Sequence, residues 1–136
     1  MPPEDPSTAL AWEWFEKAEH DALAVEQLAP TGKISDVVAF HCQQAAEKAL
    51  KAYLTWRNLP FRRVHDLEEL VNLCAGLDRA FLTLLPAAEK LSPYAVELRY
   101  PTDLPALTTA EVDEACLLMH AVMSFVQDRL PPHARP

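Results

Sequence analysis

Hydrophobic positions recur every three or four residues along most of this chain, a spacing typical of amphipathic helices. A first helix is predicted to begin at Ser7 or Thr8, either of which can cap it, and to continue to about Leu28. Residues 30–32, which contain a proline and a glycine, are expected to end it. Its expected inward stripe consists of Leu10, Trp14, Ala18, Val25 and Leu28.

A second helix is predicted from Ser35 or Asp36 to about Asn58, and its polar residues gather on one side. At about 100° per residue they occupy an arc of roughly 80°, while alanines and larger apolar residues occupy the opposite side. The apolar side of this helix is therefore suited to packing in a core, and the polar side to binding a partner. The polar side, called the polar strip below, consists of His41, Gln44, Lys48, Lys51 and Thr55.

The next segments predict two shorter helical stretches. Asp66 followed three residues later by Glu69 has the spacing of a capping box, so a third helix should start there and end at Gly76. A fourth helical pattern starts at Asp78. It contains Pro86, which should either kink the helix or split it, because proline lacks the amide hydrogen that a helix interior requires.

A final helix completes the pattern. Prolines within residues 92–107 forbid a long helix, so this segment is predicted to be an irregular connection. Thr108 and Glu111 then have capping-box spacing, and apolar residues continue on one helical face to Val126. Because the chain is 50% hydrophobic and has only two glycines, it lacks the turn residues that many short strands need. The predicted fold class is all-α.

The length and net charge of the chain limit the classes of function that it can have. The 136 residues suit one domain, predicted over residues 8–130 between a disordered N-terminal tail, 1–7, and a C-terminal tail, 131–136. A formal net charge of −8 repels nucleic-acid phosphates, so non-specific nucleic-acid binding is not expected. The chain shows no apolar run of membrane-spanning length and no basic leader, so we expect a cytoplasmic protein without membrane contact.

Most familiar reactive motifs are missing from the sequence. The three cysteines, Cys42, Cys74 and Cys116, are widely separated in apolar helical contexts, which indicates buried free thiols in a reducing compartment. The five histidines have no metal-ligand spacing, and there is no CxxC pair or HExxH motif, so a metal site is not expected. There is also no glycine-rich phosphate loop and no local signature of a nucleophile. No catalytic residue is predicted.

The polar strip is the first candidate for binding. An imidazole, an amide and two ammonium groups on one strip of an acidic chain are suited to holding an anion. Lys48 and Lys51 are expected to have no carboxylate on their own arc, because Glu47 is displaced toward its flank. The competing interpretation is a solvated polar face, which is what most charged helix faces are.

Two further segments carry positive charge. In the motif RRVHDL, Arg62, Arg63 and His65 precede the third helix, where an anion could also use free backbone amides. The same side chains could equally balance nearby acids.

In the motif LRYP, Arg99 has a planar fork that suits phosphate or carboxylate, and Tyr100 has a flat ring with a hydroxyl. Arg99 could equally pair with an acid and hold the connection in place.

Three separated motifs, HCQQAAEKALKA, VHDLEELV and Tyr94 with LRYP, together resemble the HEPN family, small helical domains named for higher eukaryotes and prokaryotes nucleotide-binding. The resemblance covers about residues 12–127. It implies an up-and-down antiparallel bundle of four main helices plus one short helix, like nucleotidyltransferase substrate-binding domains. It also implies a homodimer, with a groove lined by the second helix and by the connection before the last.

The resemblance also suggests two activities. Some family members act with a minimal nucleotidyltransferase and bind a nucleotide or the substrate of that enzyme. Others are ribonuclease toxins, in which an arginine is followed four to six residues later by a histidine. Arg99 stands in the place of that arginine, but residues 103–106 contain no histidine to serve as general acid or base. The resemblance therefore implies a non-enzymatic accessory protein, in a toxin-antitoxin-like module with a nucleotidyltransferase partner.

The implied ligand is a nucleotide such as ATP, or another anion, and no other cofactor is expected. Lys48, Lys51 and Arg99 are expected to contact phosphate, and these groups should converge with His41 on one shared cavity. Two alternatives remain. The first is a metal-independent ribonuclease toxin in which His41 or His65 replaces the missing histidine, and the second is a structural dimerisation module without ligand. The complete predicted ligand-binding set is His41, Gln44, Lys48, Lys51, Arg62, His65, Arg99 and Tyr100.

Overall fold

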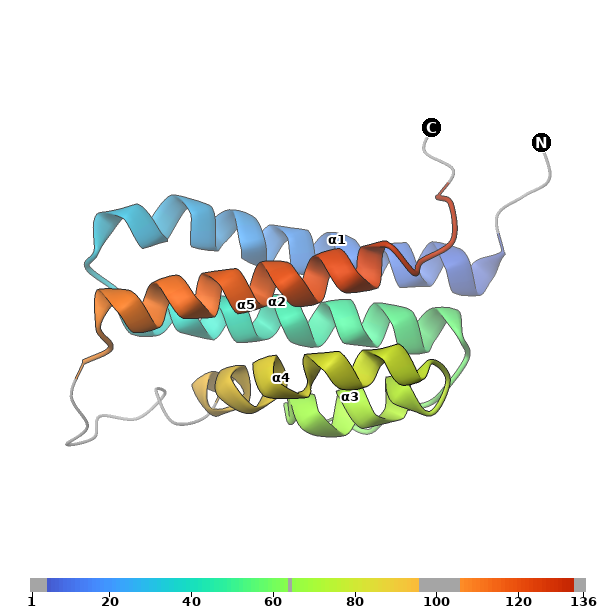
Figure 1. The fold of residues 1–136 in the computed structure, drawn as a ribbon. Helices are drawn as coiled ribbons and strands as arrows, with labels where there is room; N and C mark the ends of the chain where they lie inside the picture. The colour runs from blue at the N-terminus through green and yellow to red at the C-terminus, as the bar shows by residue number, and fades with distance from the viewer. Residues whose placement is uncertain (1–4, 64, 96–105, 134–136) are drawn as a thin grey trace.

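The computed structural model describes residues 5–63, 65–95 and 106–133, and within them all regular secondary structure is helical. In Figure 1 the long helices lie side by side, and the short helices pack along one side of them. The prediction of an all-α helical bundle is confirmed. The α-helices are α1 (Pro6–Leu28), α2 (Ser35–Trp56), α3 (Leu67–Ala75), α4 (Leu85–Leu91) and α5 (Thr109–Gln127).

Helix α2 is the centre of the bundle and packs against α1, α3, α4 and α5. The small residues Ala45, Ala46 and Ala49 on its inward side are fully buried, which lets the neighbouring helices approach closely. The helix ends at Trp56, two residues before the predicted end. Asn58 has a positive φ of 57°, a left-handed conformation that cannot continue the helix.

The inward face of α1 agrees with the predicted stripe at Ala18 and Val25, which are buried, but not at its first position. Leu10 is 48% exposed, and Ala11 and Phe15 are buried instead. The prediction of Leu10 as a core residue is wrong, and Trp14 and Leu28 are only half buried. The stripe was assigned to apolar residues alone, but the buried face of α1 includes Asp21, whose charge is paired inside the bundle.

The predicted capping residues of α3 and α5 are confirmed. The Asp66 side chain accepts hydrogen bonds from the backbone N–H groups of Glu68 and Glu69, at 3.0 and 3.4 Å. In the complete capping box of α5, the Glu111 N–H donates to Thr108 Oγ1 at 3.1 Å, and the Thr108 N–H donates to Glu111 Oε1 at 3.0 Å. These bonds satisfy amide hydrogens that have no partner within the helix.

Pro86 divides the fourth helical pattern. A 3₁₀ helix, Arg79–Leu84, leads directly into α4, and a second 3₁₀ turn, Ser92–Ala95, follows it. Pro86 lies in the first turn of α4, where its missing amide hydrogen breaks no bond of the helix. The pattern is therefore split and not merely kinked.

The two ends of the described chain lie close together, as Figure 1 shows. The indole N–H of Trp12 donates to the carbonyl oxygen of Pro131 at 3.0 Å. The ring of His133 stacks on Trp12 with 5.1 Å between ring centres. Residues 131–133 thus pack over the first half of α1. Among the described residues, no helix combines the length and the apolar character needed to cross a membrane.

Candidate functional site

Asp21 of α1 joins two members of the polar strip on α2. Its Oδ1 lies 2.8 Å from His41 Nδ1, and its Oδ2 accepts a hydrogen bond from Lys48 Nζ at 2.7 Å. The Asp21 side chain is only 10% exposed. A carboxylate this deep needs partners for both oxygens, and here each oxygen has one. Asp21 therefore holds His41 and Lys48 beside one another at the edge of the bundle.

Glu47 organises a second cluster beside the first. Its Oε2 accepts from Lys51 Nζ at 3.0 Å, and its Oε1 lies 2.8 Å from His65 Nδ1. The same Oε1 accepts from the buried Gln43 side chain at 3.2 Å. The Glu47 side chain is only 5% exposed. Its contacts connect α2 to the segment that enters α3.

Lys51 is enclosed more completely than Lys48. Its ammonium nitrogen lies 5.6 Å from the ring centres of both Trp14 and Phe61, a range in which the faces of aromatic rings attract cations. Together with Glu47, these rings surround a charge that is mostly buried. The Lys48 side chain is 26% exposed, so it is the more accessible of the two ammonium groups.

The two glutamines link the strip to the start of α3. Gln44 Nε2 donates to Gln43 Oε1 at 2.7 Å. Gln43 Nε2 in turn donates to the backbone carbonyl oxygen of His65 at 3.0 Å. Gln43 has no exposed surface, whereas Gln44 is half buried. Gln44 therefore presents an oriented amide in the middle of the strip.

Lys48 and Lys51 were expected to have no carboxylate on their own arc of the helix, yet each of them forms an ion pair. Asp21 reaches Lys48 from a different helix, so its position could not be seen on the arc of α2 alone. Glu47 lies four residues before Lys51, a spacing at which long side chains on one helix meet. When the imidazoles are neutral, the negative charges of Asp21 and Glu47 cancel the positive charges of Lys48 and Lys51. The Asp21 and Glu47 clusters together carry net positive charge only when His41 or His65 is protonated.

The other predicted residues have different surroundings. Arg62 is exposed, and its guanidinium donates to Glu69 Oε1 at 2.6 Å. This ion pair holds it at the start of α3 and does not direct it into the network around Glu47. Arg99 and Tyr100 lie outside the described residues. The structure thus joins His41 to Lys48 and His65 to Lys51, and it leaves Arg62 apart.

Three residues of these clusters were missed in the sequence: Asp21, Gln43 and Glu47. For Gln43 and Glu47 a signal was present, because Gln43, Glu47 and Lys51 recur at intervals of four along one helix. For Asp21 there was none, since its partners follow it by 20 and 27 residues. Only the packing of α1 on α2 brings it to the strip.

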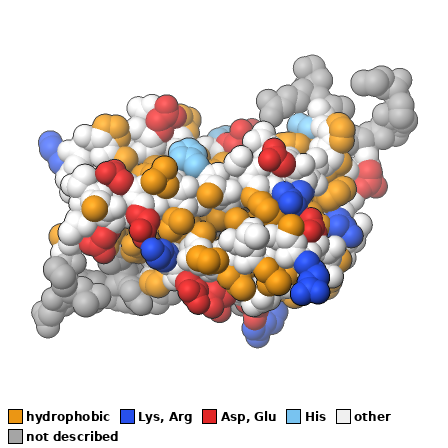
Figure 2. All heavy atoms as spheres, in the orientation of Figure 1, with side chains coloured by type: hydrophobic (Ala, Val, Ile, Leu, Met, Phe, Trp, Pro, Cys, Tyr) orange, Lys and Arg blue, Asp and Glu red, His pale blue; other side chains and the backbone are white. Residues whose placement is uncertain are grey.

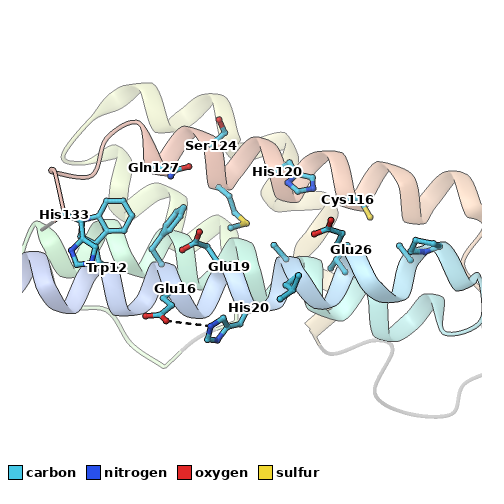
Figure 3. Close-up of a pocket in the computed structure, with 17 residues that line it drawn as sticks. Trp12, Glu16, Glu19, His20, Glu26, Cys116, His120, Ser124, Gln127 and His133 are labelled. Carbon is cyan, nitrogen blue, oxygen red and sulfur yellow. Dashed lines mark ion pairs between the residues drawn. The ribbon is translucent and has the colours of Figure 1, made fainter. Parts of the chain in front are cut away.

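A large groove lies elsewhere on the molecule. It runs between α1 and α5, has a volume of about 1350 Å³, and includes none of the six described residues of the predicted set among its lining (Figure 3). The expected shared cavity is therefore not this groove. Within residues 5–63, 65–95 and 106–133, no three His, Cys, Asp or Glu side chains are placed to hold a metal ion.

Comparison with known proteins identifies similar domains. The sequence profile of the HEPN domain matches residues 11–129. The crystal structure of TT1696 from Thermus thermophilus has a TM-score of 0.75 and 29% sequence identity, with 88% of this chain and 98% of that chain covered. ST0689, an archaeal HEPN homologue, has a TM-score of 0.71 and 22% identity, with 89% and 98% covered, which shows a shared fold. No curated protein sequence matches the chain.

Proposed function

Because this chain belongs to the HEPN domain family, we propose that it is an accessory protein that binds a nucleotide or another anionic ligand on its polar strip. In this proposal it works with a minimal nucleotidyltransferase partner, in a toxin-antitoxin-like module, and forms a homodimer. The observation that carries the proposal is the cluster around Asp21, where an ammonium and an imidazole are held side by side and remain partly accessible.

The strip offers different contacts along its length. Lys48 is the accessible ammonium group and would contact a phosphate. Lys51 is mostly enclosed by Glu47 and two aromatic rings, so its main effect on a ligand would be through the positions of its neighbours. Gln44 presents an amide on the strip between His41 and Lys48, and this amide can donate to or accept from a base or sugar. Arg99 and Tyr100 are proposed to complete the site.

Titration calorimetry with ATP, with and without the nucleotidyltransferase partner, tests this proposal. We expect Lys48→Ala to weaken binding by about tenfold or more, because a charge-assisted hydrogen bond to phosphate is lost. Lys33→Ala is the matched control, since it removes an exposed ammonium group just before α2.

Two results would contradict the proposal. The first is an absence of binding by the wild-type protein under either condition. The second is an equal loss of affinity in the Lys48 and Lys33 variants, which would indicate a general effect of charge. A stable dimer in sedimentation experiments combined with no ligand binding would favour a purely structural dimerisation module instead.

A second candidate function, metal-independent RNA cleavage, has one observation in its favour. His41 and His65 each place Nδ1 against a carboxylate and are partly exposed, an arrangement that orients an imidazole for acid-base chemistry. Incubation of the purified protein with a fluorescent RNA tests it. Cleavage that is lost in His65→Ala or His41→Ala but kept in His120→Ala, an exposed control on α5, would support this function. Intact RNA in every case would exclude it.

A further inference from the structure

The groove between α1 and α5 is a feature that the proposed anion site does not use. Figure 1 shows that these helices run in opposite directions, and both pack on α2. Its lining extends from Trp12 on α1 to Pro30 in the 3₁₀ turn, Ala29–Thr31, that directly follows α1, which corresponds to about 27 Å. A second helix of about five turns would match that length. The groove is thus long enough to hold a helical segment and not only a small molecule.

The groove has a mixed lining, about half of it apolar. Phe15, Val25 and Met123 form part of its floor and are buried in the core, whereas Leu23 on α1 is 53% exposed. On the face of the molecule drawn in Figure 2, hydrophobic side chains are exposed between charged ones. An exposed leucine beside an apolar groove gives an incoming apolar side chain surface to bury. The lining therefore favours an amphipathic partner.

The carboxylate side chains that line the groove are not matched by lysine or arginine in the lining. Among the described residues that line it are three glutamates and no lysine or arginine. Glu16 lies 3.9 Å from His20, whereas Glu19 and Glu26 form no ion pair or side-chain hydrogen bond with any described residue. Figure 3 shows Glu19 and Glu26 between α1 and α5. The α1 side of the groove therefore attracts positive charge.

The spacing of Glu19 and Glu26 predicts how basic residues would be spaced on a partner helix. Glu19 and Glu26 are seven residues apart, about 10.5 Å along the helix axis, with Leu23 between them. Basic side chains seven residues apart on a facing helix have the same separation. An apolar residue between them would lie against Leu23. The complementary segment is therefore a helix with an apolar stripe and a basic flank.

We propose that the groove between α1 and α5 binds an amphipathic helix of a partner protein that carries basic residues beside its apolar face. A second copy of this chain is a poorer match, because a symmetric contact would bring Glu19 and Glu26 of both copies into one interface. The net charge of −8 adds to that repulsion. Since residues of the polar strip do not line the groove, the partner and an anion could bind at the same time.

A synthetic helical peptide of about 18 residues, with leucines on one face and lysines seven residues apart beside it, is a suitable probe. Its binding is measured by fluorescence anisotropy on the full chain. We expect the double variant Glu19→Gln with Glu26→Gln to weaken binding by about tenfold. The matched control, Glu13→Gln with Glu89→Gln, removes two exposed acids outside the groove and should change affinity less than about twofold.

A second pair of variants tests the apolar contact. Leu23→Ser should weaken peptide binding by about tenfold. Leu117→Ser should not, although Leu117 is 71% exposed, because it lies outside the groove on α5. Equal binding of a peptide with glutamates in place of lysines, or no binding of the basic peptide, would overturn the proposal. So would a wild-type dimer that Leu23→Glu converts to monomer, since a second copy would then cover the groove.

Discussion

Single buried carboxylates determine how the polar residues of this bundle are arranged. Asp21 and Glu47 each receive hydrogen bonds on both oxygens, from lysine on one and from histidine on the other. Burial of a charge without such partners would cost several kcal/mol. These two acids therefore explain why His41, Lys48, Lys51 and His65 have fixed positions at the edge of the core.

Replacement of Asp21 tests this arrangement directly. Asp21→Ala leaves the ammonium of Lys48 and the imidazole of His41 without their shared acceptor, so we expect the free energy of unfolding to fall by about 2 kcal/mol. Urea unfolding followed by circular dichroism measures the loss. Glu13→Ala on the same helix is the control, because Glu13 is exposed. Equal stability of the two variants would show that the Asp21 cluster does not contribute.

The cysteines are a second group of individual residues whose surroundings determine their chemistry. Cys42 and Cys74 are buried free thiols, as predicted, whereas Cys116 is half buried. Burial raises the pKa of all three thiols above the ordinary value, which keeps them protonated and unreactive at neutral pH. Sγ of Cys42 and Sγ of Cys116 lie 4.0 Å apart, in contact between α2 and α5. Their position indicates a packing role.

At the scale of whole helices, the sequence marks the starts of α3 and α5 more clearly than the face that a helix buries, whereas α1 begins at Pro6, before the predicted cap at Ser7 or Thr8. Capping residues act through nearby backbone amides, so Asp66 and Thr108 were identified from the local pattern alone. The inward face of α1 depends on how that helix rotates against α2, and its predicted stripe missed the buried Asp21. Pro86 could be read locally as a break because its effect is on its own helix.

The capping box of α5 provides a test at this scale. Thr108→Ala removes the side-chain acceptor of the Glu111 N–H, so we expect the protein to lose about 1 kcal/mol of stability. Thermal unfolding in a calorimeter measures the change. Thr109→Ala is the control one residue later, where the side chain is exposed and is not the cap. A loss of the same size in both variants would mean that the cap itself adds little.

At the scale of the molecule, contacts between distant segments hold the last helix in place. Arg129, just after α5, donates to Asp78 Oδ2 at 3.0 Å, and its guanidinium carbon lies 3.5 Å from the ring centre of Phe125. Phe125 packs edge to face on the buried Phe81, with 4.9 Å between ring centres. This assembly joins the end of α5 to the segment that precedes α4.

The ion pair of Asp78 makes stability depend on pH. The backbone N–H of Ala80 and then the Arg129 side chain lower the pKa of Asp78 below its ordinary value of 3.8. Because the folded pKa is the lower one, this stabilisation is complete above about pH 4 and is lost as pH falls through the folded value. Asp78→Asn should therefore lower the melting temperature at pH 7, and lower it by less as the pH falls toward 2.

Melting temperatures measured by circular dichroism between pH 7 and pH 2 check this prediction. Asp113→Asn on the exposed surface of α5 serves as the control for removal of one acidic group. A difference between wild type and Asp78→Asn that stays constant across this range would show that ionisation of Asp78 is not coupled to folding. The same conclusion would follow if, as pH falls, the difference from wild type became smaller for Asp113→Asn and not for Asp78→Asn.

The sequence by itself determined the helical class, the capped starts of α3 and α5 and the position of the polar strip, because each depends on interactions within about one or two helical turns. The tertiary structure decided the electrostatics of that strip. Asp21 follows no pattern that connects it to His41 and Lys48, and only the packing of α1 on α2 places its carboxylate between them. The groove between α1 and α5 likewise appears only when two helices from opposite ends of the chain lie side by side. Charges and cavities of this kind arise between elements, so no single helical pattern contains them.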